Sequence, residues 1–225
     1  MCNLVISAHP DDEILGCGGI IKKLSSREDF FVVIMTGGAD GRYSGDMEEK
    51  LRQNAKDANR LIGTKELFFE SFPNQKLETM PLSSIIQSIE AYIASLKPHR
   101  VFTHFANDLN KDHQILAEAT FTATRPIVGQ VVKEVYSYNV PSSTEWNMTD
   151  LAKMFVPNVF VDIKDEIDAK IEAMKRYPSE CRPYPHPRSP EALRVHANYW
   201  GLTVGVEYAE PFKLVRKIGV GGLVN

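Results

Sequence analysis

Short apolar runs alternate along the chain with longer segments in which apolar residues recur every three or four positions. The runs predict buried strands at 4–6, 30–35, 67–69, 101–103, 134–138 and 158–163. The longer segments predict helices at 14–26, 47–62, 81–96 and 112–124. Pro81 opens one helix, Pro98 follows its end, and Gly63 closes another. Strands that alternate with helices of this length predict βαβ units and a parallel sheet.

We therefore expect a Rossmann-like α/β fold, with a doubly wound, mostly parallel sheet and helices on both faces. The chain of 225 residues is long enough for one domain, 1–225, with a well-buried core. We expect residues 1–163 to form the sheet core. Residues 164–225 are expected to add a helical and loop segment packed on it, with a proline-rich loop at 177–190.

Charge and hydropathy exclude several classes of protein. The net charge is −3, and 26 basic and 29 acidic residues are spread along the chain, which argues against a nucleic-acid-binding face. No apolar run approaches the roughly 20 residues that span a bilayer. The N-terminus lacks the basic start and apolar stretch of a signal peptide, so we expect a cytoplasmic protein.

The three cysteines are Cys2, Cys17 and Cys181, an odd number at distant positions. They predict neither a disulfide framework nor a CxxC metal site. A bound metal would therefore need histidine and carboxylate ligands.

Acidic residues and a histidine follow the first predicted strand, in the segment Ala-His-Pro-Asp-Asp-Glu at 8–13. Ligands of open α/β sheets bind at the carboxyl ends of the strands. The glycines come later and do not read GxGxxG, and three acids would repel a pyrophosphate, which argues against a dinucleotide site. Helix capping would explain the acids but not His9. Two adjacent carboxylates in one cleft also repel each other unless a cation lies between them.

The pattern fits a metal site completed from a second strand end. His9 and Asp12 lie three residues apart across a turn stiffened by proline, so both can contact one ion, and Asp11 is left as a base. His113 begins the helix after the strand at 101–103. Two imidazoles, one carboxylate and an open fourth position are typical of catalytic zinc. Asp112 can orient one of these metal-binding side chains through a hydrogen bond instead of binding the metal itself.

Several motifs together resemble the PIG-L/LmbE-like zinc deacetylase family, which includes N-acetylglucosaminyl deacetylases. They are AHPDDE at 8–13, GG at 18–19, TGG at 36–38, NDLNKDH at 107–113, HPRS at 186–189 and AEPF at 209–212. The resemblance implies a Rossmann-like fold, one Zn²⁺ per chain (other divalent transition metals being possible), and hydrolysis of an N-acetyl group on an amino sugar or sugar conjugate.

The resemblance also implies roles for single residues. His9, Asp12 and His113 match the family's metal ligands, Asp11 its general base, and Asp112 the acid beside the metal histidine. Many relatives carry a histidine where this chain has Asn110. An amide can donate a hydrogen bond but cannot relay a proton. We expect either that Asn110 donates to the oxyanion, or that His186 or an arginine takes over.

Five further residues are candidate substrate contacts. Arg52 matches an arginine that some family members place on the helix after the second strand. Arg42 lies in a glycine-rich loop and His186 in the proline-rich loop, and loops carry function more often than their share. Arg125 can bind an anion or simply end a helix. Trp146 can stack on a sugar or lie buried.

The expected partner is an N-acetylated sugar or sugar conjugate, and apolar, proline-rich C-terminal segments allow a homo-oligomer. Two other interpretations remain open. His9, Asp11 and a distant histidine also form the ligand pattern of non-haem Fe(II) oxygenases, although those sites lie on antiparallel sheets. The same scaffold can also carry a non-catalytic sugar- or metal-binding module.

Overall fold

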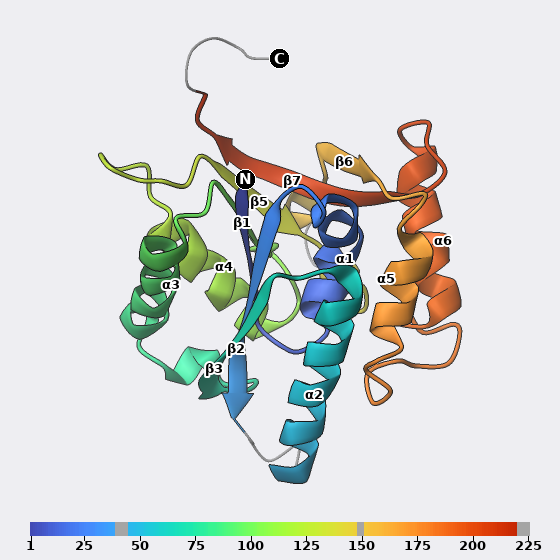
Figure 1. Ribbon diagram of the computed structural model, residues 1–225, viewed down its shortest axis with the longest axis horizontal. Helices are drawn as coiled ribbons and strands as arrows, with labels where there is room; N and C mark the ends of the chain where they lie inside the picture. Colours follow the sequence, from blue (N-terminus) through green and yellow to red (C-terminus); the bar gives the residue numbers. More distant parts are fainter. Residues whose placement is uncertain (39–44, 148–150, 220–225) are drawn as a thin grey trace.

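The computed structural model describes residues 1–38, 45–147 and 151–219, and Figure 1 shows their arrangement. Seven strands form one sheet in the order β3-β2-β1-β4-β5-β7-β6. The strands are β1 (Cys2–Ser7), β2 (Asp29–Gly38), β3 (Glu66–Pro73), β4 (Arg100–His104), β5 (Glu134–Tyr138), β6 (Val159–Asp162) and β7 (Ala209–Lys217). Neighbours among the first five pair in parallel, and β7 runs antiparallel to β5 and to β6.

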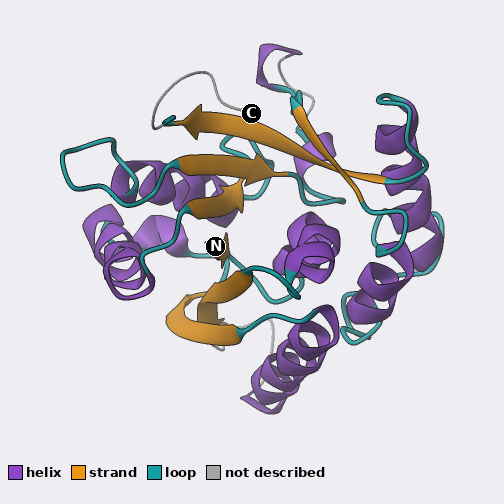
Figure 2. Ribbon diagram, turned by 45° about the horizontal axis from the view of Figure 1, so that its top comes forward, coloured by secondary structure: helices purple, strands orange, loops and turns teal. Residues whose placement is uncertain are grey.

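Helices cover both faces of the sheet (Figures 1 and 2). One face carries α1 (Asp12–Leu24), α2 (Gly45–Ile62), α5 (Ile167–Met174) and α6 (Pro190–Leu202), and the other carries α3 (Leu82–Leu96) and α4 (Lys111–Ala123). Side chains of β1 alternate between the two cores: Val5 packs on the first face, and Leu4 and Ile6 on the second. This two-sided burial explains why the strands read as short continuous apolar runs.

The predicted Rossmann-like α/β fold is therefore confirmed. The C-terminal segment differs from the expectation of helices and loops alone, because 164–225 also supplies β7, which lies inside the sheet between β5 and β6. The run at 209–217 mixes charged with apolar residues because only its first half is buried. This mixed pattern hid the strand in the sequence.

The order of strands determines where a ligand can bind. The chain moves from β1 outward to β2 and β3, and then returns to place β4 on the other side of β1. The loops after β1 and β4 therefore leave the sheet side by side but lead to helices on opposite faces. This arrangement is the topological switch point, where open α/β sheets bind ligands.

A buried ion pair from the C-terminal segment reaches into the middle of α1. Glu210 of β7 accepts hydrogen bonds from the backbone N–H groups of Gly19 (2.6 Å) and Ile20 (2.7 Å). Lys170 of α5 donates to Glu210 (2.6 Å) and to the carbonyl of Leu15 (2.8 Å). A Cβ at Gly19 would lie 2.8 Å from the Glu210 carboxyl carbon, so the absence of a side chain at Gly19 allows this close approach.

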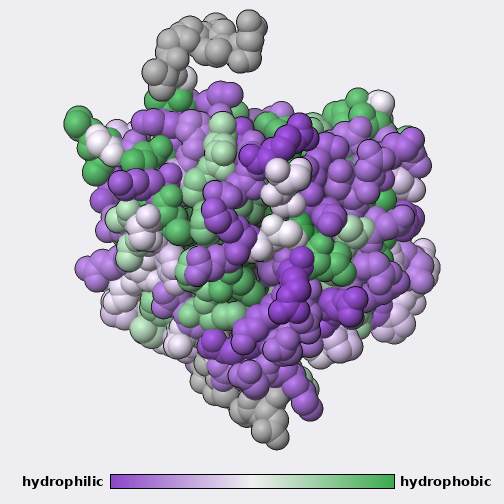
Figure 3. Space-filling model, viewed as in Figure 1, coloured by the Kyte–Doolittle hydropathy of each residue, from purple (hydrophilic) through white to green (hydrophobic). Residues whose placement is uncertain are grey.

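The face shown in Figure 3 is largely hydrophilic, with small, separate hydrophobic patches. Among the described residues, no helix has the length and apolar character needed to cross a membrane.

Candidate metal centre and active site

Two loops at the switch point supply the central side chains. The loop after β1 carries His9 and ends at Asp12, the first residue of α1. The loop after β4 ends at Asn110, whose side-chain carbonyl caps α4 by accepting from the Asp112 backbone N–H (2.9 Å). The cap fixes the first turn of α4, and His113 in that turn therefore faces the loop after β1.

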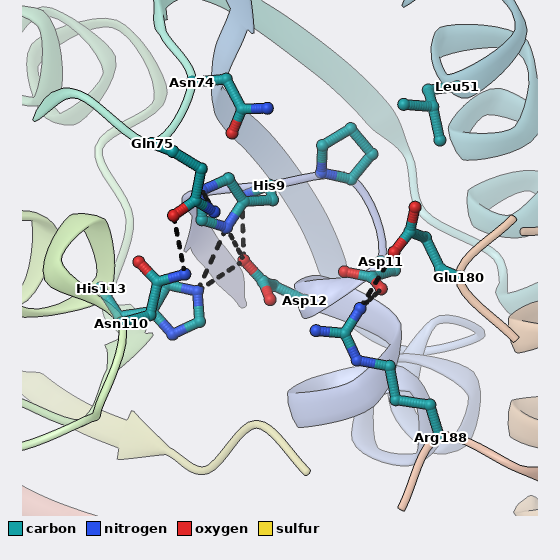
Figure 4. A pocket seen from close by; sticks show the side chains of 11 residues that line it. His9, Asp11, Asp12, Leu51, Asn74, Gln75, Asn110, His113, Glu180 and Arg188 are labelled. Carbon is teal, nitrogen blue, oxygen red and sulfur yellow. Dashed lines mark hydrogen bonds and ion pairs between the residues drawn. The ribbon is translucent and has the colours of Figure 1, made fainter. Parts of the chain in front are cut away.

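Three ligand atoms, one each from His9, Asp12 and His113, form a nearly equilateral triangle (Figure 4). His9 Nδ1 lies 3.2 Å from His113 Nε2 and 3.3 Å from Asp12 Oδ2, and the last two atoms are 3.2 Å apart. Zinc–nitrogen and zinc–oxygen bonds of about 2.0–2.2 Å in tetrahedral geometry require ligand atoms at about this spacing. The three predicted ligands are brought together, and we call this set the metal triangle.

A carboxylate lies close to the other nitrogen of each imidazole. His9 Nε2 lies 3.0 Å from Asp112, and His113 Nδ1 lies 3.1 Å from Asp108. Asp112 also accepts from the backbone N–H groups of Gln75 (2.7 Å) and Leu77 (3.0 Å), which ties the segment after β3 to the site. Carboxylates of this kind fix the ring orientation of metal-binding histidines. Asp112 thus contacts the imidazole of His9, although it precedes His113 in sequence.

The metal triangle concentrates charge in a buried space. Burial favours the neutral form of His113, but Asp12 and Asp108 outweigh it and raise its pKa to about 10. Burial also pushes the pKa of Asp12 up, but His113 and His104 outweigh it and hold that pKa well below its usual value. Without metal, protons on imidazole balance these carboxylates. A divalent cation can replace those protons, so the donor set fits a metal by charge as well as by spacing.

Asp11 is next to Asp12 in sequence, but its side chain points the other way (Figure 4). Its carboxylate accepts from Arg188 (2.8 Å), and the same guanidinium contacts Glu180 (3.1 Å) and Ser142 (2.7 Å). Burial raises the pKa of Asp11 well above its usual value, and the Arg188 cation opposes that shift. Asp12 therefore belongs to the metal triangle, whereas its sequence neighbour Asp11 is paired with a cation of its own.

A small pocket of about 80 Å³ joins the two sides of the site. Amide side chains are frequent in its wall, and Asn110 Nδ2 donates to Gln75 Oε1 (3.4 Å), while Gln75 Nε2 lies 3.2 Å from His9 Nε2. Because the Asn110 carbonyl is used in the helix cap, its NH₂ group is the part turned toward the pocket. The lining residues are His9, Pro10, Asp11, Asp12, Leu51, Asn74, Gln75, Asn110, His113, Glu180 and Arg188.

The four candidate substrate contacts that the structure describes lie outside this lining. Arg52 pairs with Glu48 (3.2 Å), and its guanidinium lies over the Phe69 ring. Arg125 pairs with Glu90 just beyond the C-terminal end of α4. This position agrees with the alternative interpretation of Arg125 as a cation at a helix end. Trp146 and His186 contact each other edge to face, with ring centres 6.0 Å apart. Arg42 lies outside the described residues.

Sequence reasoning missed five polar residues of the site: Asn74, Gln75, Asp108, Glu180 and Arg188. The HPRS motif pointed to the correct loop, but the residue that reaches the pocket is Arg188 rather than His186. Asp108 stood in the recognised block at 107–113, five residues before the histidine that it contacts. Gln75 and Glu180 gave no local signal, because only the tertiary fold brings them to the strand ends.

The fold and site together define a Rossmann-like α/β protein with a candidate two-histidine, one-carboxylate metal centre at the switch point. The family model described as PIG-L, GlcNAc-PI de-N-acetylase, matches residues 4–124, more than half of the chain. The chain belongs to this family.

Relatives and solved structures of similar fold cover most of the chain. It is 27% identical over 183 residues to the uncharacterized deacetylase YaiS of Escherichia coli K12, covering 78% of this chain and 90% of YaiS. The N,N'-diacetylchitobiose deacetylase of Pyrococcus horikoshii has a TM-score of 0.76 at 23% identity, covering 96% and 84% of the two chains. GalB, the 4-carboxy-2-hydroxymuconate hydratase of Pseudomonas putida, has a TM-score of 0.74 at 20% identity, covering 99% of each.

Proposed function

We propose that this protein is a zinc-dependent hydrolase that removes an N-acetyl group from an amino sugar or sugar conjugate. Membership of the PIG-L family and similarity to deacetylases support the reaction class. The spacing and charge of the metal triangle support the metal. A single observation carries the proposal: Asp11, a buried carboxylate, lines the same pocket as the metal triangle and is not part of it.

Bound zinc would supply a Lewis acid that makes a water acidic near neutral pH. Asp11 is the group that accepts the proton of the attacking water and then delivers it to the leaving amine. One carboxylate can serve both steps because the proton that it accepts in the first step is the proton that it donates in the second. Arg188 opposes the effect of burial on Asp11 and so shifts this carboxyl toward the ionised form that a base requires.

Asn110 is proposed as the donor to the oxyanion that develops on the acetyl carbonyl. Its NH₂ group lines the pocket, and its carbonyl is held in the cap of α4, so the donor is oriented before substrate binds. One such donor contributes about 2.7–4 kcal/mol to transition-state stabilisation. The neighbouring amide of Gln75 can add a second donor or contact a sugar hydroxyl.

The two alternatives that the sequence left open fit the site less well. Non-haem Fe(II) oxygenases place their ligands on antiparallel sheets, whereas the strands here that carry the site, β1 and β4, are parallel. A binding module has no need of a buried carboxylate beside its metal. A hydratase such as GalB shares the fold, and fold alone does not determine function.

We also propose that the chain works in the cytoplasm, where reduced thiols match its three free cysteines. Homo-oligomer formation stays a prediction. Arg42, Arg52, Arg125, Trp146 and His186 stay candidate contacts for parts of a substrate that extend beyond the pocket.

The decisive experiment is an assay of released acetate from N-acetylglucosamine, N,N'-diacetylchitobiose and UDP-N-acetylglucosamine. The zinc-loaded protein is compared with the same protein after chelation and after zinc is restored. We expect anaerobic acetate release that chelation abolishes and zinc restores. Turnover that requires oxygen and a keto acid, or hydration of an unsaturated acid without acetate release from any of the sugars, would overturn the proposal.

A further inference from the structure

The backbone of Asp11 adopts a conformation that non-glycine residues rarely occupy, with φ of 105° and ψ of −28°. The conformation has a local use. The Asp11 carbonyl accepts from the N–H groups of Ile14 (3.0 Å) and Leu15 (2.9 Å), which starts α1, while the side chain turns toward Arg188. Strain of this kind persists only where the surroundings hold it in place.

Glu13 contacts this backbone directly. Its Oε2 accepts from the Asp11 N–H at 3.1 Å, two residues earlier in the chain. Its Oε1 accepts from the Tyr177 hydroxyl at 2.5 Å and from Asn59 Nδ2 at 2.9 Å. Glu13 is fully buried, and its three donors come from three separate parts of the fold.

Those donors are themselves held in place. Asn59 lies on α2, where its side chain also donates to the Ala55 carbonyl (3.0 Å) and accepts from Thr64 (2.7 Å). Tyr177 follows α5 and is fully buried. The Glu13 carboxylate therefore lies between two fixed donors on one side and the strained peptide of Asp11 on the other.

We propose that Glu13 is a positioning residue that holds Asp11 in its strained conformation, so that the Asp11 carboxylate points beside the metal triangle instead of into it. The inference rests on the proposed function, because it assigns Asp11 the role of base. In the part of the chain that the structure describes, the Glu13 carboxylate accepts from Asp11, Asn59 and Tyr177 and not from His9 or His113, so its effect on the reaction passes through Asp11. Relaxation of the Asp11 φ would swing the base away from the position it needs.

The main test is a double-mutant cycle on the zinc-loaded protein, with acetate release from N,N'-diacetylchitobiose, or from whichever sugar of the panel is turned over. Glu13→Gln keeps the size of the side chain but places an NH₂ group among three donors. We expect kcat to fall about 10²-fold, the loss associated with a misplacement of about 1 Å, while KM and zinc content stay within about twofold. In the Asp11→Asn background, Glu13→Gln should cause no further loss.

The second test uses the metal-free protein and needs no substrate. The Asp11 amide should exchange slowly with deuterium in the wild-type chain, because it is buried and bonded to Glu13. Glu13→Gln should accelerate that exchange by more than about tenfold, with little change at the amides of Ile20 and Ile21 in the same helix. NMR hydrogen exchange measures these amides separately.

Two controls separate positioning from loss of stability. Glu210→Gln also removes a buried carboxylate that accepts from α1, but it lies far along the helix from Asp11, so it should lower Tm without the 10²-fold loss of kcat. Tyr177→Phe removes one donor to Glu13 and keeps the carboxylate, so we expect a smaller loss of kcat. This variant replaces Glu13→Gln in the test if Glu13→Gln does not fold.

Equal losses of kcat from Glu13→Gln in the wild-type and Asp11→Asn backgrounds would overturn the inference, as would unchanged exchange at the Asp11 amide. If no sugar is hydrolysed but exchange at Asp11 accelerates as expected, the positioning of Asp11 stands and the proposed reaction fails. The two failures are therefore distinguishable.

Discussion

Helix α1 contacts two buried charged clusters that differ in how their charges are balanced. In its middle, the Glu210 carboxylate meets Lys170 and two backbone N–H groups, so every charge has a partner supplied by the chain. At its N-terminus, Asp12 meets His9 and His113, which can balance it only while they carry protons. The first cluster is complete without a ligand, and the second requires protons or a metal.

The difference shows how a structural ion pair can be told from a functional one. Both clusters are buried and both join segments far apart in sequence. A complete pair mainly fixes packing, and removing one partner leaves an uncompensated charge. An incomplete cluster brings acidic groups together at a cost in folding free energy. Such a cluster is typical of a functional site, where binding of a ligand offsets that cost.

The largest effect is expected from a substitution that removes one member of the metal triangle. His113→Ala removes one of three ligands and leaves Asp12 without its main positive partner. We expect zinc content and acetate release to be lost together. Metal analysis after gel filtration, beside an activity assay, checks this, and full zinc occupancy in the variant would refute the ligand assignment.

Asp11→Asn should separate chemistry from metal binding. The amide cannot accept a proton, so kcat should fall by about 10²–10⁴-fold while zinc remains bound. Steady-state kinetics and metal analysis on one preparation measure both quantities. A variant with near wild-type kcat would show that Asp11 is not the base.

Lys170→Met probes the complete cluster and should change stability without changing zinc content. It leaves Glu210 buried without its cation, which costs about 3–5 kcal/mol of unfolding free energy. Urea denaturation measures the loss. Lys175→Met is the matched control, because Lys175 also pairs with a glutamate but at the surface, and it should change little. Equal effects of the two substitutions would contradict the comparison.

The smallest expected effect concerns His196 of α6. Burial, with a smaller contribution from Lys170, lowers the pKa of His196 to about 4. As pH falls, the unfolded chain, with a histidine pKa near 6.5, binds a proton at this residue before the folded chain does. The contribution of neutral His196 to the free energy of unfolding is therefore complete above about pH 6.5 and is lost as pH falls toward 4. The loss is at most about 3 kcal/mol. His196→Gln should flatten the dependence of unfolding free energy on pH in this window, and an unchanged slope would exclude the effect.

How much the sequence predicts depends on how local each signal is. His9, Asp11 and Asp12 share one turn, and His113 begins the helix after a neighbouring strand, so spacing and strand order suffice to bring them together. Arg188 and Gln75 reach the pocket only through the tertiary fold, and no periodicity marks them. Arg52 and Arg125 do not line the pocket, and each pairs with a nearby carboxylate, Glu48 or Glu90, while their predicted contacts with substrate stay predictions.

The order in which the site's parts leave the ribosome follows from their positions. All three corners of the metal triangle are synthesised by residue 113, whereas Tyr177 and Arg188, which hold and face Asp11, emerge some sixty or more residues later. A nascent chain therefore contains all three side chains of the candidate metal site before the residues that contact Glu13 and Asp11 have been made. A metal ion bound at that stage would link the segments that follow β1 and β4 before β5, β6 and β7 are synthesised.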